Sequence, residues 1–288
     1  MPEASERPPA PAPLPSPVAD THCHLDLARE QADVGAGPDH EWTGPARALA
    51  DAAAVNVTRV VQIGCDLPGA AWAVAAATDF PNVVAGVALH PNEAPRLAAR
   101  RTLDEALTEI DRLAGSSGRV HAVGETGLDH FRTDTDGHAV QETSFRAHIE
   151  MARRHAKALV IHDRDAHADV LRVLDDAPLP DRVVFHCFSG DVDMARHCAS
   201  RGWFLSFAGT VTFTNAGGLR SALAVTPLDR VLVETDAPFL TPHPHRGRPN
   251  GSYLLPLTVR KVAEVLGTDL DTTCAALQRN TEEAFGSW

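Results

Sequence analysis

The segment VADTHCHLD, residues 18–26, decides between two fold classes for this chain. It opens with a short apolar run typical of a buried strand. A doubly wound dinucleotide-binding sheet normally carries a glycine-rich phosphate turn after its first strand, but here the strand leads into two histidines. In extended backbone His22 and His24 point to one side and Cys23 to the other. The segment therefore favours a different parallel α/β fold, with side chains for chemistry at the strand end.

Seven further apolar runs follow, separated by segments of helical period. These predicted strands span residues 58–64, 82–89, 120–125, 158–162, 182–188, 202–207 and 230–235. The predicted helices span residues 45–55, 69–79, 102–114, 139–156, 165–176, 191–201, 217–225, 256–266 and 271–285. Continuous apolar strands that alternate with helices indicate a parallel sheet covered on both faces. Eight such units predict a single α/β domain, a TIM (β/α)8 barrel.

The predicted barrel domain spans residues 18–288. Residues 1–17 are rich in proline, and we expect them to form a disordered extension. The first loop, roughly residues 25–44, is long enough to be a candidate lid. The chain shows neither the pattern of a signal peptide nor an apolar run of the ~20 residues that span a bilayer. We therefore expect a cytoplasmic protein without membrane contact, and a monomer is the default.

Composition argues against a disulfide framework, a zinc knuckle and a broad surface for duplex DNA. The five cysteines are widely spaced and contain no C-x-x-C pair, which disfavours a disulfide framework and a zinc knuckle. The formal net charge of −12 disfavours a broad surface for duplex DNA. An acidic protein still binds phosphate where metal ions supply local positive charge.

Six polar residues fall at the ends of the predicted strands. They are His22, His24, Glu125, His162, His186 and Asp236. Barrel active sites are built at the carboxyl ends of the strands, so we expect one shared site. Imidazole and carboxylate suit zinc and manganese, and carboxylate also admits magnesium. Six ligands exceed the need of one tetrahedral ion, which predicts two divalent cations ~3.5–4 Å apart that share an activated hydroxide and hydrolyse an ester.

Taken in their order along the chain, several short motifs resemble those of the TatD family of metal-dependent hydrolases. The matching segments are DTHCHLD (20–26), GVALHPNEA (86–94), VGETGLDHFR (123–132), VIHDRDAH (160–167), VFHCFSG (184–190), VETDAPFLTP (233–242), RGRPNGSY (246–253) and NTEEAF (280–285). The resemblance runs from about residue 18 to the end of the chain. It implies a phosphodiesterase, a 3′–5′ exodeoxyribonuclease that trims single-stranded nucleic acid. The implied partners are nucleic-acid ends or small phosphodiesters.

The resemblance also implies a role for each candidate ligand. Glu125 would bridge two ions. One ion would be completed by the ligands His22, His24 and Asp236, and the other by His162 and His186. Asp236 and Glu125 would be the catalytic carboxylates, with Asp236 accepting a proton from the attacking water.

Several rim residues are candidates for supporting roles. His90, Arg132 and Arg164 are placed to contact a substrate phosphate, with surface ion pairing as the alternative. Asp20 and Asp129 are expected to orient ligand imidazoles, as metal-bound histidines usually require.

The chain departs from the usual family pattern near the expected site. Thr126 replaces an aliphatic residue, His130 and Phe131 replace an aromatic pair, and Asn250-Gly251-Ser252 stands where Asn-Glu-Pro is usual. None of these positions is a proposed ligand. By the resemblance, the loops that carry them would surround the leaving group of the substrate.

Two other functions remain open. Related barrel amidohydrolases bridge their metals with a carboxylated lysine at the end of the fourth strand. Glu125 holds that place, and neither Lys157 nor Lys261 ends a predicted strand, so the lysine-bridged version is excluded. An amidase or aminoacyl-ester hydrolase bridged by Glu125 is not excluded. A non-catalytic barrel that binds nucleic acid would be supported by lost ligands, but all six are present.

Overall fold

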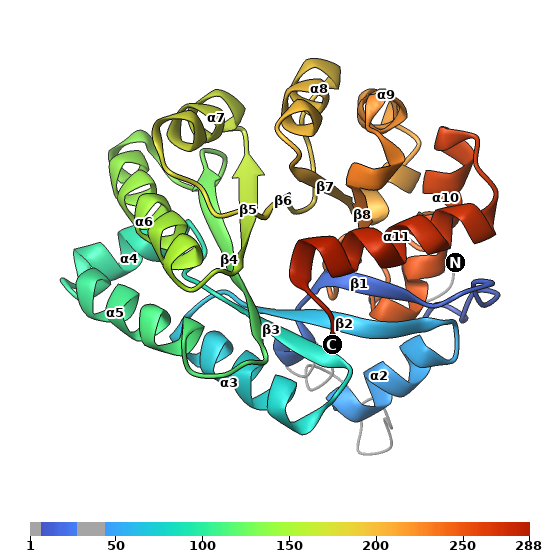
Figure 1. The fold of residues 1–288 in the computed structure, drawn as a ribbon, viewed down its shortest axis with the longest axis horizontal. Helices are drawn as coiled ribbons and strands as arrows, with labels where there is room; N and C mark the ends of the chain where they lie inside the picture. The colour runs from blue at the N-terminus through green and yellow to red at the C-terminus, as the bar shows by residue number, and fades with distance from the viewer. Residues whose placement is uncertain (1–6, 28–43) are drawn as a thin grey trace.

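The computed structural model describes residues 7–27 and 44–288 (Figure 1). Eight parallel strands form one sheet in the order β1-β2-β3-β4-β5-β6-β7-β8. Their bounds are β1 (Val18–Cys23), β2 (Val57–Gly64), β3 (Val83–Val87), β4 (Val120–Asp129), β5 (Ala158–Arg164), β6 (Val183–Phe185), β7 (Phe204–Phe207) and β8 (Val231–Val233). Past the end of β8, a parallel bridge pairs Ala237 with Cys23 and brings the sheet back to β1. The predicted TIM barrel is confirmed, as a nearly closed barrel in a single domain.

Helices alternate with the strands and surround the sheet (Figure 1). They are α2 (Pro45–Ala53), α3 (Leu67–Asp79), α4 (Glu93–Ala99), α5 (Leu103–Ala114), α6 (Thr135–Arg154), α7 (His167–Asp176), α8 (Val192–Ser200), α9 (Gly217–Val225), α10 (Leu255–Leu266) and α11 (Leu270–Phe285). Helix α4 was not predicted, because seven residues with an internal proline are too short for a helical period to be recognised. In the described parts of the chain, no helix has the length and hydropathy needed to cross a bilayer.

Two apolar layers hold the barrel together. Val60 and Val83 belong to the layer between the sheet and the helices. Their neighbours Val61 and Val84 belong to a second cluster that fills the barrel interior, since successive side chains of a strand point to opposite faces. Phe285, at the end of α11, joins this inner cluster. The interior is thus a packed core that supports the site at the opposite end of the strands.

The N-terminal segment corrects one expectation. Residues 7–17 pack against the barrel, whereas residues 1–17 were expected to be disordered. Leu14 is buried, the backbone oxygen of Pro8 accepts a hydrogen bond of 3.0 Å from the Tyr253 hydroxyl, and Arg7 pairs with Asp51 at 2.7 Å. Proline prevents helix formation, but an extended segment can still satisfy its carbonyls on a neighbouring surface. Residues 1–6, and residues 28–43 of the predicted lid, lie outside the described residues.

Candidate metal centre

All six candidate ligands lie together at the carboxyl end of the barrel. His22 belongs to β1, and His24 follows it. Strands β4 and β5 continue past Glu125 and His162, which therefore lie within strands and not at their last residue. His186 follows β6, and Asp236 follows β8. The common rim that the sequence predicts is the arrangement found.

Glu125 reaches the centre of this rim because of a local irregularity in the sheet. The register between β4 and β5 shifts between Val123 and Thr126, so the strands are out of step around Glu125. Such irregularities re-aim side chains next to active sites. The residue before Glu125 is Gly124, where a Cβ atom would collide with the side chain of Val160. Only glycine permits this close approach of the two strands.

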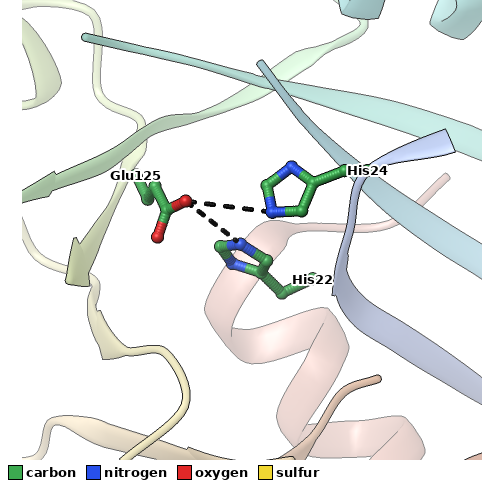
Figure 2. A group of neighbouring side chains, drawn as sticks. All are labelled: His22, His24 and Glu125. Atoms are coloured by element: carbon green, nitrogen blue, oxygen red, sulfur yellow. Dashed lines mark ion pairs between the residues drawn. The ribbon is translucent and has the colours of Figure 1, made fainter. Parts of the chain in front are cut away.

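The first carboxylate oxygen of Glu125 faces the histidines of β1. Figure 2 shows Oε1 directed toward both imidazoles, with separations of 3.9 Å to Nε2 of His22 and 3.8 Å to Nε2 of His24. Asp236 completes this group, with Oδ1 3.8 Å from Nε2 of His22 and 3.3 Å from Nε2 of His24. Two imidazoles and two carboxylates thus converge on one point.

The second carboxylate oxygen of Glu125 faces the other two histidines. Oε2 lies 2.6 Å from Nε2 of His186 and 3.2 Å from Nδ1 of His162. These two ring nitrogens are themselves 3.3 Å apart. Each oxygen of Glu125 therefore faces a different pair of imidazoles, which is the arrangement that a bridging carboxylate requires.

The outer nitrogens of three imidazoles contact oxygen atoms that orient the rings. Nδ1 of His24 lies 3.0 Å from the backbone oxygen of Ile63. Nε2 of His162 lies 3.3 Å from Oδ2 of Asp129, and Nδ1 of His186 lies 3.2 Å from Oε1 of Glu234. Contacts of this kind set the tautomer so that the inner nitrogen keeps its lone pair.

Asp20 has a different role from the one expected. Its Oδ1 accepts hydrogen bonds from the backbone N–H of Thr235 at 2.9 Å and from that of His22 at 3.4 Å, and Oδ2 accepts one from the Thr235 hydroxyl at 2.5 Å. Asp20 therefore ties β1 to the end of β8 and fixes the His22 backbone, instead of orienting an imidazole ring.

Two contacts of the centre were missed in the sequence. Glu234 is a buried acidic residue directly after the apolar strand β8, and that mismatch is the signal that could have revealed it. The thiol of Cys65 donates to Oε1 of Glu125 over 3.1 Å. Nothing in the sequence pattern distinguishes this cysteine from the other four.

The buried imidazole of His22 provides a test of whether a metal ion fits. It has no exposed surface, and neither ring nitrogen has a hydrogen-bond partner among the described residues. Burial and the neighbouring His186 hold the pKa of His22 well below its usual range, so the ring is neutral. A buried polar atom without a partner is costly, and a lone pair beside carboxylates is suited to a divalent cation. The residues present therefore fit such an ion.

The carboxylate at the centre is ionised despite its burial. Burial raises the pKa of Glu125, but the charge of His186 and the hydrogen bonds from His162 and His186 outweigh it and lower the pKa well below the usual range. Burial lowers the pKa of His24, but the Asp236 carboxylate and the charge of Glu125 raise it to about 9. The centre thus holds negative charge that protons or metal cations neutralise.

The three predicted phosphate contacts have different surroundings. The His90 ring lies 4.5 Å from that of His162, and burial lowers its pKa to about 3. The guanidinium of Arg164 lies 4.0 Å from the centroid of the Phe131 ring. Arg132 lines a surface pocket between α4 and α6. His90 is therefore beside the cluster, whereas Arg132 faces a separate depression.

This fold and site define a class of protein, the metal-dependent hydrolases built on a (β/α)8 barrel. Within that class the chain belongs to the TatD family, whose model, described as TatD related DNase, matches residues 19–286.

Similar proteins agree with this assignment. The uncharacterized metal-dependent hydrolase TatD of Mycobacterium tuberculosis is 43% identical over 276 residues, which are 93% of this chain and 98% of the relative. The uncharacterized metal-dependent hydrolase YcfH of Escherichia coli K12 is 36% identical over 275 residues, which are 93% of this chain and 94% of the relative. The crystal structure of YjjV, a TatD homolog from Escherichia coli K12, has a TM-score of 0.83 at 25% identity and covers 94% of this chain and 98% of its own.

Proposed function

We propose that this chain hydrolyses phosphodiester bonds at the ends of single-stranded nucleic acid and that it uses two divalent cations. The observation that carries the proposal is that the two oxygens of Glu125 face two separate pairs of imidazoles. One ion would be held through Oε1 by His22, His24 and Asp236. The other would be held through Oε2 by His162 and His186. Magnesium, manganese and zinc all suit these ligands.

The chemistry divides between the ions and the protein. Two divalent cations, when bound, acidify water and polarise a phosphoryl oxygen. The protein positions the groups that move protons and hold the substrate. With a net charge of −12, it attracts a phosphate only where the site itself is positive.

Asp236 is the proposed general base. Its side chain is 14% exposed, so water reaches the carboxylate. The backbone at Asp236 is left-handed, with φ of 54°, and its N–H donates to the backbone oxygen of His22 over 2.9 Å. This uncommon conformation, held by the end of β1, points the carboxylate toward the histidines. A carboxylate fixed in this way is suited to accept a proton from attacking water.

His90 is proposed to donate a hydrogen bond to the substrate. Its Nδ1 accepts the backbone N–H of Asn92 over 3.1 Å, so the proton of the neutral ring lies on Nε2. A neutral ring with this tautomer donates to a phosphate oxygen without adding charge. Arg164, which ends β5, would supply a positive charge next to the same site.

Nucleic acid is favoured as the substrate by the family model, whose description names a DNase. The relatives are described more broadly as metal-dependent hydrolases. A substrate panel must therefore distinguish a nuclease from an aminoacyl-ester hydrolase.

The test is a panel of substrates with magnesium, manganese, zinc or chelator. The panel contains end-labelled single-stranded DNA and RNA, duplex DNA, aminoacyl-RNA and a simple phosphodiester. We expect metal-dependent shortening of the single-stranded DNA from its 3′ end, which a ladder from the 5′-labelled strand reveals. Hydrolysis of the aminoacyl ester, with every phosphodiester intact in each metal, contradicts the proposal.

A further inference from the structure

Two large apolar side chains stand out because they are exposed in the described part of the chain. Phe131 is 60% exposed and Phe239 is 46% exposed. Single apolar residues are common on protein surfaces, and exposure alone implies no function. Both residues, however, are linked to the candidate metal centre, Phe131 through its backbone and Phe239 through its ring.

Phe131 is fixed beside the His162 half of the centre. Its backbone N–H donates to Oδ1 of Asp129 over 3.0 Å, and Oδ2 of the same carboxylate lies 3.3 Å from Nε2 of His162. The guanidinium of Arg164, two residues after His162, covers the ring at 4.0 Å from its centroid. One carboxylate thus contacts both the Phe131 backbone and a candidate ligand.

Phe239 is fixed beside the other half. Its backbone N–H donates to the backbone oxygen of Asp236 over 2.8 Å, and its own carbonyl accepts the Asn250 amide over 2.5 Å. The ring centroid lies 6.1 Å from that of His24, in an edge-to-face arrangement. This ring is therefore tied to the loop that carries Asp236.

The two rings lie on opposite sides of the centre. Phe131 and Arg164 come from the ends of β4 and β5, whereas Phe239 follows β8 and touches the residue after β1. In the nearly closed barrel ordered β1 to β8, the β4–β5 side lies across from the β8–β1 side (Figure 1). The candidate ligands lie between them.

We infer that the two rings are stacking platforms for nucleobases on both sides of the bond to be cleaved. This inference rests on the proposed function and adds to it the two side chains that would hold the bases next to the cleaved bond. An exposed aromatic ring stacks on any base, which binds single strands without sequence preference. Paired bases keep their faces covered by their neighbours, so a duplex interior cannot use the two platforms.

Arg164 strengthens the first platform. A guanidinium over an aromatic ring adds a cation–π contact. In the described part of the chain no carboxylate forms an ion pair with Arg164, so its charge is available to the phosphate next to a stacked base. This positive group compensates locally for the acidic net charge of the protein.

The inference is tested with two single strands of one sequence, one complete and one carrying abasic residues at its last three 3′ positions. We expect the wild-type kcat/KM to be about tenfold or more lower on the abasic strand. Phe131→Ala and Phe239→Ala should each lower kcat/KM on the complete strand by about tenfold, mainly through KM, and narrow the difference between the strands. Phe131→Trp and Phe239→Trp should preserve that difference, because a flat ring remains.

Phe80→Leu is the matched control, since it removes a half-buried ring next to the start of β3, at the opposite end of the barrel. It should preserve the preference for the complete strand. The stacking inference is overturned if the alanine variants lower kcat/KM equally on the two strands, or if the wild type cleaves both strands equally well. Neither result contradicts the proposed hydrolysis. A metal-loaded wild type that cleaves neither strand overturns the proposed function itself. Thermal unfolding of each variant verifies that it is folded.

Discussion

Asp129 and His162 form a carboxylate–imidazole pair, in which Oδ2 lies 3.3 Å from Nε2. The other nitrogen of this ring, Nδ1, lies 3.2 Å from Glu125. Burial raises the pKa of Asp129, but hydrogen bonds from His162 and the Arg132 backbone lower it below its usual range. An ionised Asp129 keeps the imidazole proton on Nε2, so Nδ1 presents its lone pair to an ion.

Asp129→Asn should weaken the binding of one ion. The amide loses the charge that orients His162, and changes in such orienting groups cost about 10- to 100-fold in metal affinity. Titration calorimetry of metal-free protein should show one weakened site and one unchanged site. Asp111→Asn is the control, because Asp111 pairs with His155 at 2.8 Å on the surface. Equal affinities for Asp129→Asn and Asp111→Asn would show that the pair does not tune the metal site.

Asp236→Asn should slow turnover more than it weakens substrate binding. A general base acts in the transition state, and its removal typically costs 10²–10⁴-fold. Steady-state kinetics on single-stranded DNA should show kcat lower by about 100-fold or more with KM changed only a few-fold. Metal content is measured in parallel, because Asp236 is also a candidate ligand. Unchanged kcat at full metal content contradicts its role as base.

Metal binding should release protons at neutral pH. Without metal, the His24 pKa is raised to about 9, so the ring is protonated at pH 7 and must lose its proton before it binds an ion. Affinity should therefore rise with pH toward 9. Calorimetry in buffers of different ionisation enthalpy counts the protons released. Binding at pH 7 that releases none contradicts this assignment of charge.

His148 should make the metal-free protein less stable in mild acid. Its Nε2 accepts the Leu89 N–H over 3.1 Å, and burial lowers its pKa from 6.5 to about 4. As pH falls below 6.5 the unfolded chain takes up this proton first, so stability present above pH 6.5 is lost as pH falls toward 4. The loss is about 3 kcal/mol for a shift of this size.

Urea unfolding measures this contribution of His148 to the free energy of unfolding. The wild type and His148→Gln are compared in chelator at pH 7 and pH 4. The wild type should lose more unfolding free energy on acidification than the variant, which has no imidazole to protonate. Equal losses in the two proteins would rule out His148 as the source.

Most of the fold could be predicted from the sequence because its signal is repeated. Eight apolar strands with intervening helices leave few architectures, and parallel strands bring their ends to one rim. That rule also placed the candidate ligands together without any contact being known. What it could not supply is the exact course of each element. Strand β4 continues to Asp129, past the predicted end at residue 125, since Gly127 and Leu128 still pair with β5.

Other features depend on contacts that have no sequence pattern. Cys65 follows β2 and Glu125 lies in β4, so their contact depends on the folded barrel, in which β3 separates these two strands. The proline-rich residues 7–17 lie on the barrel because the side chain of Leu14 is buried there. Tyr253 and Arg260 also donate hydrogen bonds to backbone oxygens of this segment. The composition of residues 7–17 does not reveal these contacts with the barrel. The role of Asp20 likewise depends on the closure of β8 against β1.

Glu125 is proposed to bridge two ions. Metal analysis of reconstituted and desalted protein tests it most directly, with wild type, Glu125→Ala and His186→Ala compared. We expect two ions per wild-type chain, one in His186→Ala, and loss of both together in Glu125→Ala, because each oxygen of Glu125 faces a separate pair of histidines. A folded Glu125→Ala variant that fully retains one ion, or a wild type that binds only one, would contradict it.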